Sequence, residues 1–138
     1  MADRGKILVI DDDSLFCQMT AAILGSRGYQ VEVATSRDEG LSKMEASRPD
    51  LVVLDVMMDW VLDGVSLSRE MMDSAALRDI PIVMCTSIRN SEYRGYFPQD
   101  EYLHIDDWLD KPCSPADLVS AVERILARRG RFRALARP

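Results

Sequence analysis

Short apolar runs alternate along the chain with longer segments in which apolar residues recur every three or four positions. A strand buried on both faces has a nearly continuous apolar sequence, so the short runs predict β-strands. The predicted strands cover residues 6–10, 29–34, 51–54, 81–85 and, with a weaker pattern, 107–109. The helical periods lie at residues 14–27, 36–47, 64–76 and from 114 onward.

Residues 88–105 have no clear period, and we expect one short helix there followed by a long loop. Five strands alternating with five helical segments favour a single α/β domain, a doubly wound parallel sheet with right-handed crossovers. We expect the flavodoxin-like strand order 2-1-3-4-5, in which the first and third strands flank the point where ligands bind.

The predicted helix ends carry side chains that suit capping. Asp13 or Ser14 is expected to cap the first helix, and Gly28 is expected to end it. Ser36 and Glu39 form a capping box for the second helix, and the last helix is expected to fray at Gly130. The predicted apolar face of the first helix comprises Phe16, Met19, Ile23 and Leu24.

Composition is typical of a globular domain, but charge is unevenly distributed along the chain. Residues 128–138 contain five arginines and no acid, although the whole chain has a net charge of −6. The remaining residues therefore carry about −11, which argues against nucleic acid as a direct ligand of the globular part. We interpret residues 1–128 as the domain and 129–138 as a disordered basic tail. Docking of the tail to an acidic partner, a membrane or nucleic acid is the alternative.

No apolar stretch approaches the roughly 20 residues that span a bilayer, and the N-terminus lacks the apolar segment of a signal peptide. The three cysteines, Cys17, Cys85 and Cys113, are widely spaced and have no metal-ligand pattern. They predict reduced thiols and a cytoplasmic location.

Carboxylates follow two of the predicted strands directly. Asp11, Asp12 and Asp13 come after the first strand, and Asp55 comes after the third. Because these strands are neighbours in the expected order, their carboxyl ends bring the acids to one edge of the sheet. Like charges held together need a cation, and Mg²⁺ takes one or two carboxylates and several waters, which suits Asp11 and Asp12.

The fourth and fifth strands would deliver Thr86 and Lys111 to the same edge. Asp55 could then act as a nucleophile on phosphorus and form an aspartyl phosphate. The cation and Lys111 would neutralise two phosphoryl oxygens, and the Thr86 hydroxyl would donate to the third.

With these residues in place, the chain resembles receiver domains of the two-component response-regulator family, with a chemotaxis-regulator-like fold, over about residues 5–128. The matching segments are ILVIDDD, LVVLDVMM followed by DG, PIVMCTS and DKP. The resemblance implies that Asp55 accepts phosphate from a histidine of a sensor kinase or a histidine phosphotransfer protein. It also implies that Asp11, Asp12, Asp55 and the backbone carbonyl of Met57 hold Mg²⁺.

Further roles are implied by the same resemblance. Thr86 and Lys111 would bind the phosphoryl group, and Trp108 would occupy the aromatic switch position. Thr86 and Trp108 would move together and change the face formed by the fourth helix, fifth strand and fifth helix. Such a protein is no enzyme beyond its own phosphorylation and slow dephosphorylation.

The chain departs from the family pattern in its loops. The loop after Asp55 is one residue longer than usual, and the stretch from Thr86 to Lys111 is a few residues longer. Apolar Met57 and Ile88 occupy the positions that flank the phosphoryl group in the family, and apolar side chains cannot orient an attacking water. We therefore expect a long-lived phosphoryl group.

Output is expected to pass to a downstream protein, because only about ten residues follow the last predicted helix. Family members also often pair, so a homodimer is possible. One rival interpretation is a haloacid-dehalogenase-type phosphatase with Asp11 as nucleophile and Asp13 as its partner. That interpretation needs a cap insertion, which the sequence lacks, and leaves Asp55 without a task. Another is a binding module that signals without phosphate.

Overall fold

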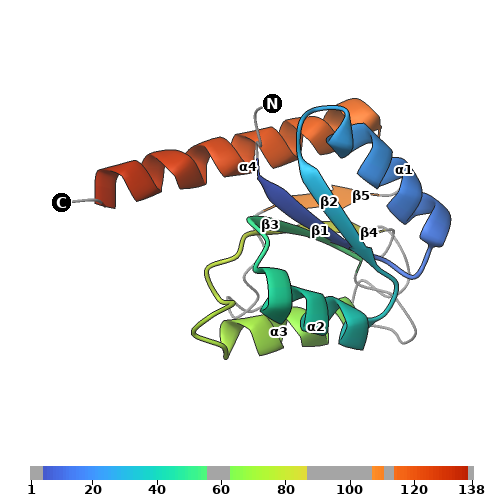
Figure 1. The fold of residues 1–138 in the computed structure, drawn as a ribbon, viewed down its shortest axis with the longest axis horizontal. Coiled ribbons are helices and arrows are strands. Elements are labelled where there is room, and N and C mark those ends of the chain that lie inside the picture. The colour runs from blue at the N-terminus through green and yellow to red at the C-terminus, as the bar shows by residue number, and fades with distance from the viewer. Residues whose placement is uncertain (1–4, 56–62, 87–106, 111–113, 137–138) are drawn as a thin grey trace.

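The computed structural model describes residues 5–55, 63–86, 107–110 and 114–136. Its strands are β1 (Lys6–Ile10), β2 (Gln30–Ala34), β3 (Leu51–Leu54), β4 (Ile82–Thr86) and β5 (Asp107–Asp110). Its helices are α1 (Ser14–Gly25), α2 (Arg37–Ser47), α3 (Asp63–Met72) and α4 (Pro115–Ala136). The chain alternates between strand and helix through most of this order, as the sequence predicts (Figure 1).

The described strands form one parallel sheet in the order β2-β1-β3-β4-β5. This confirms the predicted α/β class and the predicted neighbourhood of β1 and β3. The full count of five strands with five helices stays a prediction, because the short helix expected within residues 88–105 lies outside the described residues.

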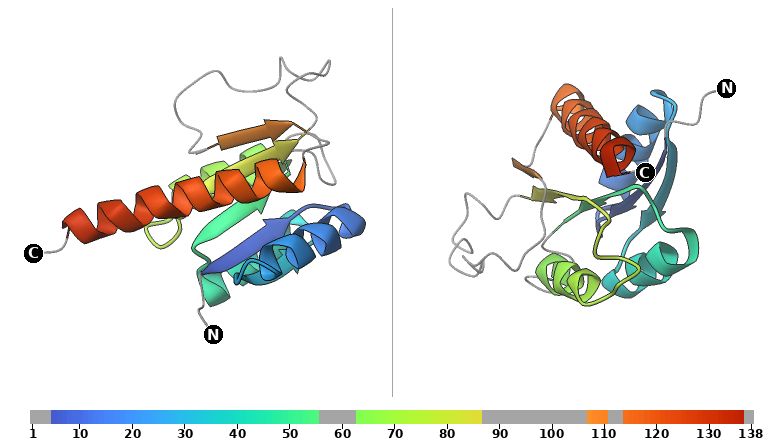
Figure 2. Two further views of the ribbon diagram at one scale, coloured as in Figure 1. Left: turned by 90° about the horizontal axis from the view of Figure 1, so that it is seen from above. Right: turned by 90° about the vertical axis from the view of Figure 1, so that its left-hand side faces the viewer.

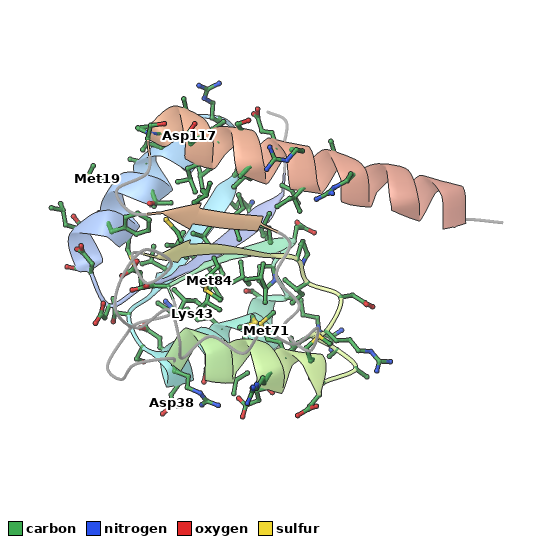
Figure 3. The ribbon with its side chains drawn as sticks, turned by 180° about the vertical axis from the view of Figure 1, so that it is seen from behind. Met19, Asp38, Lys43, Met71, Met84 and Asp117 are labelled. Carbon is green, nitrogen blue, oxygen red and sulfur yellow. The ribbon has the colours of Figure 1, made fainter. Side chains whose placement is uncertain are left out.

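Two apolar layers enclose the sheet, since successive residues of a strand point to opposite faces. On one face Leu8, Ile10 and Met84 pack with α2 and α3 through Met44 and Met71, as Figure 3 shows for Met71 and Met84. On the other face Ile7, Val9 and Val83 pack with α1 and α4. Figure 2 shows the resulting three layers, with a helix pair on each side of the sheet.

The N-cap of helix α1 is one of the two residues expected from the sequence. Asp13 is the N-cap, and its side chain accepts hydrogen bonds from the backbone N–H groups of Leu15 and Phe16 at 3.0 and 3.1 Å, while Ser14 is the first residue of the helix. Aspartate and serine are equally favourable caps, so the choice between adjacent residues is not decided by residue type. The helix ends at Gly25 rather than near Gly28, which follows with a φ of +96°.

The buried face of α1 also differs from the predicted one. Cys17, Thr20 and Leu24 are buried, whereas Met19 is 54% exposed and lies on the outer side of the helix (Figure 3). Cys17 and Leu24 are seven residues apart and share one helix face. The prediction for Met19 is wrong because a small thiol and a threonine, which carry little hydrophobic signal, line that face.

The predicted capping box of α2 is confirmed, with one change. The Glu39 N–H donates to Ser36 Oγ at 3.2 Å, while Glu39 Oε1 accepts the backbone N–H of Thr35, one residue before the cap, at 2.8 Å. This hydrogen bond lowers the pKa of Glu39, because it favours the ionised carboxylate.

The last two helices differ from their predicted lengths. Helix α3 ends at Met72, one turn short of the expected Ala76, and α4 continues unbroken to Ala136. The expected fraying at Gly130 and the expected disorder of the following residues are therefore wrong through residue 136. A single glycine costs a helix only about 1 kcal/mol, and the arginine, alanine and leucine residues around it favour helix. None of the described helices combines the length and apolarity needed to cross a bilayer.

Packing between α2 and β1 leaves no room for a side chain at Gly40. A methyl group there would lie 2.6 Å from Ile10 Cδ1 and 3.1 Å from both Ile10 Cγ atoms, and Ile10 is fully buried. Overpacking of about 1–3 kcal/mol should outweigh the roughly 1 kcal/mol of helix propensity that alanine adds. We expect Gly40→Ala to lower the free energy of unfolding by about 1 kcal/mol or more, measured by urea denaturation.

Gly25 is the matched control, because a methyl group at this helical glycine would meet no atom within 4 Å. Gly25→Ala should leave the free energy of unfolding unchanged or raise it by up to about 1 kcal/mol. If the two substitutions changed the free energy of unfolding equally, the contact with Ile10 would not be the cause of the destabilisation by Gly40→Ala.

Candidate functional site

Two backbone hydrogen bonds place the acidic residues at the carboxyl edge of the sheet. The Asp11 N–H donates to the carbonyl of Ala34 at 3.0 Å, and the Asp55 N–H donates to the carbonyl of Ile10 at 3.0 Å. Each aspartate therefore continues its strand by one ladder bond before the chain leaves the sheet. Asp11 and Asp55 consequently lie at the carboxyl ends of β1 and β3, which are neighbouring strands of the sheet although they are far apart in sequence.

The carboxylates of Asp11, Asp12 and Asp55 meet at this edge. Each offers a ligand oxygen, and these three oxygens lie within 4.8 Å of one another. Asp11 and Asp55 are 1% and 6% exposed, whereas Asp12 is exposed. The cluster thus offers three ligand oxygens, two from buried residues and one from an exposed residue. Oxygen ligands of this kind are what a hard divalent cation requires.

Asp13 does not belong to this cluster of ligand oxygens and has a structural role instead. Its side chain caps α1, and its backbone N–H donates to Asp11 Oδ1 at 2.9 Å. The turn into α1 thus orients the Asp11 carboxylate, and one of its oxygens already accepts a hydrogen bond. A charged side chain occupied as a helix cap is poorly placed for acid–base catalysis.

One supporting residue was not identified from the sequence. The Cys17 thiol is buried and donates to the backbone carbonyl of Asp11 at 3.2 Å. A thiol is a weak donor, so the bond adds to the positioning of Asp11 without fixing it alone. The seven-residue spacing from Leu24 could have indicated that Cys17 is buried, but no sequence signal indicates its hydrogen bond.

The other predicted site residues are described only in part. Thr86 is the last residue of β4, and its register partner in β5 is Asp110, the residue before Lys111. The backbone of Trp108 lies in β5, opposite Met84. Lys111, Pro112, Met57 and Ile88 lie outside the described residues, as do the side chains of Thr86 and Trp108.

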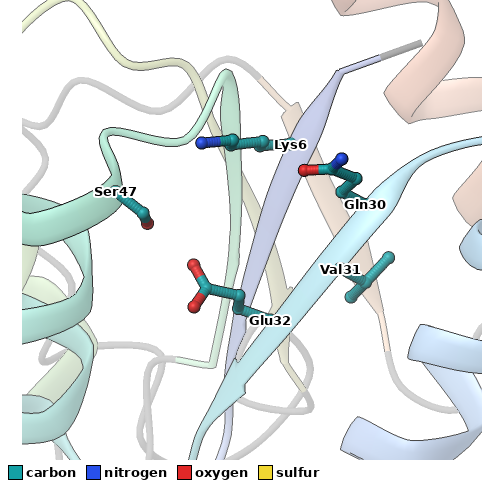
Figure 4. Close-up of a pocket in the computed structure, with 5 residues that line it drawn as sticks. All are labelled: Lys6, Gln30, Val31, Glu32 and Ser47. Carbon is teal, nitrogen blue, oxygen red and sulfur yellow. The ribbon is translucent and has the colours of Figure 1, made fainter. Parts of the chain in front are cut away.

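A hollow of about 400 Å³ lies at the opposite edge of the sheet. It is lined by Lys6, Gln30, Val31, Glu32 and Ser47, at the amino ends of β1 and β2 and the end of α2 (Figure 4). Among the predicted site residues whose side chains the structure describes, none lines this hollow. The carboxylate cluster that was predicted from the sequence therefore remains the candidate site.

Comparison with known protein families supports this assignment. The model of the response regulator receiver domain matches residues 7–123. The alkaline phosphatase synthesis transcriptional regulatory protein PhoP of Bacillus subtilis is 34% identical over 123 residues, 89% of this chain and 49% of that protein. The phosphate regulon transcriptional regulatory protein PhoB of Escherichia coli is 29% identical over 126 residues, 89% of this chain and 52% of that protein. The chain thus spans about half the length of the curated relatives it matches.

Solved structures give the same result. A CheY-like response regulator receiver domain protein from Methanospirillum hungatei superposes with a TM-score of 0.79 at 26% identity, covering 92% of this chain and 97% of that one. The signal receiver domain of a histidine kinase from Syntrophus aciditrophicus has a TM-score of 0.78 at 32% identity, covering 89% and 90%. Because the family model spans most of the chain, the protein belongs to the response regulator receiver domain family, which serves phosphorylation-based two-component signalling.

Proposed function

We propose that this receiver domain accepts a phosphoryl group on Asp55 from a phosphohistidine of a partner kinase or histidine phosphotransfer protein, in a Mg²⁺-dependent reaction. The observation that carries the proposal is the convergence of Asp11, Asp12 and Asp55 at the carboxyl edge of the sheet. Three like charges at this distance repel one another, and a divalent cation offsets that repulsion.

The residues present fit Mg²⁺. Asp11, Asp12 and Asp55 offer carboxylate oxygens, the backbone carbonyl of Met57 would complete the protein ligands, and water can enter past the exposed Asp12. When bound, the cation supplies positive charge against the oxygens of the entering phosphoryl group.

The other parts of the phosphoryl transfer depend on side chains of this protein. An Asp55 carboxylate oxygen forms the new bond to phosphorus as the bond from phosphorus to the imidazole nitrogen breaks, and the imidazole leaves with that electron pair. The Lys111 ammonium neutralises one phosphoryl oxygen, and the Thr86 hydroxyl donates to another. The register of Thr86 beside Asp110 supports this role, because Lys111 follows Asp110 directly.

We infer that the signal leaves through the face formed by the helix expected before β5, β5 itself and α4, with Thr86 and Trp108 as the switch pair. A downstream protein in the cytoplasm would bind that face. The domain itself would not catalyse a reaction on a separate substrate. Receiver domains are generally signalling domains and not enzymes. We place the domain at residues 1–128 and regard the rest of α4 as an addition to it.

The haloacid-dehalogenase alternative is not favoured. The family match covers residues 7–123, and the second acid that this chemistry would need, Asp13, is engaged as the cap of α1. A module that signals without phosphate stays an alternative that a phosphorylation experiment excludes directly.

Asp55→Asn should abolish covalent labelling. With Mg²⁺ and acetyl phosphate, we expect wild type to gain one phosphoryl group on Asp55, because only that carboxylate would face the donor as a nucleophile. Mass spectrometry of the intact chain and of its peptides measures the label. Beryllofluoride binding gives a second readout on the same proteins.

Asp13→Asn is the control that separates the two chemistries. Asparagine caps a helix as well as aspartate does, so the start of α1 should be preserved. The proposal predicts that this variant is still labelled at Asp55. Turnover of phosphate that depends on Asp11 and Asp13, with no stable label, would establish the phosphatase instead, and labelling of neither residue would support the phosphate-independent module.

Asp12→Asn should weaken Mg²⁺ binding by about tenfold or more, because one of the converging charges is removed from beside a divalent ion. Isothermal titration of Mg²⁺ measures the dissociation constant. Glu45→Gln removes an equally exposed carboxylate near the far end of α2 and should leave the affinity unchanged. Equal losses in the two variants would mean that Mg²⁺ responds only to the net charge.

The aspartyl phosphate should persist for minutes or longer at neutral pH, because Met57 and Ile88 provide no polar group to orient a hydrolytic water. Met57→Asn should shorten the half-life about tenfold or more by offering such a group, and Met57→Leu should not. Decay of isolated, labelled protein followed by phosphate-affinity electrophoresis measures both. A wild-type label that disappears within seconds would contradict this prediction.

A further inference from the structure

Strand β2 forms one edge of the sheet, because the described strands are ordered β2-β1-β3-β4-β5. The backbone groups of Gln30 and Ala34 bond to the β1 side. Alternate residues of a strand bond to the same neighbour, so Val31 and Val33 direct their backbone groups away from β1. An edge strand has no second strand to satisfy such groups or to hold its outer side in place.

Two side chains of α2, Glu39 and Lys43, bind the outer side of β2 at its carboxyl end, and we call this pair the α2 clamp. Lys43 Nζ donates to the carbonyl of Val33 at 2.6 Å. Glu39 Oε1 accepts the backbone N–H of Thr35 at 2.8 Å, and Glu39 Oε2 lies 3.4 Å from Lys43 Nζ. Hydrogen bonds to charged groups are stronger than those between neutral groups. The clamp thus holds the backbone on both sides of Ala34.

Ala34 in turn holds Asp11. Its carbonyl accepts the Asp11 N–H at 3.0 Å, the bond that places this aspartate at the carboxyl edge of the sheet. Asp55 is held differently, because it follows β3, which lies between β1 and β4. The position of Asp11 therefore depends on an edge strand, and the outer side of that strand is bound by α2.

Helix α2 is itself fixed against the sheet. Met44 is fully buried in the core, and Gly40 lies so close to Ile10 that a methyl group would be 2.6 Å from Ile10 Cδ1. These residues are the sequence neighbours of Lys43 and Glu39, whose side chains are 35% and 43% exposed. An exposed ion pair alone stabilises little, but here both members also bind the backbone of β2 from a helix that the core holds in place.

We propose that Glu39 and Lys43 are positioning residues for the metal site. They hold the end of β2 through its backbone, and through Ala34 they keep the Asp11 carboxylate within the cluster that would bind Mg²⁺. The inference rests on the proposed function for the role of the cation and adds two residues of α2 to it. The support that it assigns to Asp11 can be measured without any metal.

Amide hydrogen exchange, followed by NMR without divalent cations, tests this support directly. Lys43→Met keeps the length of the side chain and removes the ammonium. We expect the Asp11 N–H to exchange about fivefold faster or more, and the Asp55 N–H to exchange at its wild-type rate. Glu39→Ala removes the other half of the clamp and should have the same effect. Lys43→Arg supplies another cationic donor and should preserve the protection of Asp11.

Titration of Mg²⁺ separates an effect of position from an effect of charge. Lys6→Met is the matched control, because Lys6 is an exposed lysine at the amino end of β1, the opposite edge of the sheet. Loss of one positive charge makes the domain more negative, so this control should bind Mg²⁺ as tightly as wild type or slightly more tightly. Lys43→Met makes the same charge change and should instead weaken binding by about threefold or more.

Circular dichroism and thermal unfolding of every variant confirm that the fold is retained. An unchanged exchange rate at Asp11 in Lys43→Met would overturn the proposal, and so would equal acceleration at Asp11 and Asp55, which indicates a general loosening of the sheet. Binding of Mg²⁺ as tight in Lys43→Met as in Lys6→Met would also overturn it. A wild type that binds no Mg²⁺ would contradict the proposed function instead, and exchange at Asp11 would still decide whether the clamp holds this residue.

Discussion

The hydrogen-bonded sheet, which holds like-charged carboxylates together at one edge, is the constraint on which the candidate site of this protein depends. Asp11, Asp12 and Asp55 hold oxygens within 4.8 Å of one another, and two of the three are almost fully buried. The residues stay close together because the backbone beneath them is held. That backbone is held by the bonds from Asp11 to Ala34 and from Asp55 to Ile10, which belong to the sheet itself.

The stiffness of this edge comes from burial on both faces of the sheet. Residues of β1, β3 and β4 alternate between two apolar layers, one under α2 and α3 and the other under α1 and α4. A shift of one residue in β1 would exchange the two layers and move Asp11 away from Asp55. The apolar core therefore determines the spacing of the acidic residues, although none of its side chains is charged.

The strands and the cluster of Asp11, Asp12 and Asp55 could be predicted from the sequence because their signals are local and strong. The bounds of β1 and β3 were predicted to the residue, since fully buried strands have uninterrupted apolar sequences that end in aspartate. The capping box of α2 was equally clear, because Ser36 and Glu39 stand at a spacing with one physical meaning.

The errors occur where tertiary contacts decide between similar local choices. The sequence left the cap of α1 open between Asp13 and Ser14, which cap a helix equally well, and in the structure Asp13 is the cap. The buried face of α1 is lined by Cys17 and Thr20, which a hydrophobic pattern does not register. Gly130 predicted an end for the last helix, but the good helix formers around it outweigh one unfavourable residue. The hydrogen bond by which Cys17 supports Asp11 could be found only in the three-dimensional structure.

The same topology that gathers the acids also separates them from the arginine-rich end of α4, residues 128–136. In a parallel sheet every crossover helix runs back against the strands, so a helix that outlasts its sheet emerges at the amino edge. Any excess of arginine on that extension lies opposite the aspartates. Chain direction alone therefore places the acidic residues and the arginine-rich end of α4 at opposite ends of the strands.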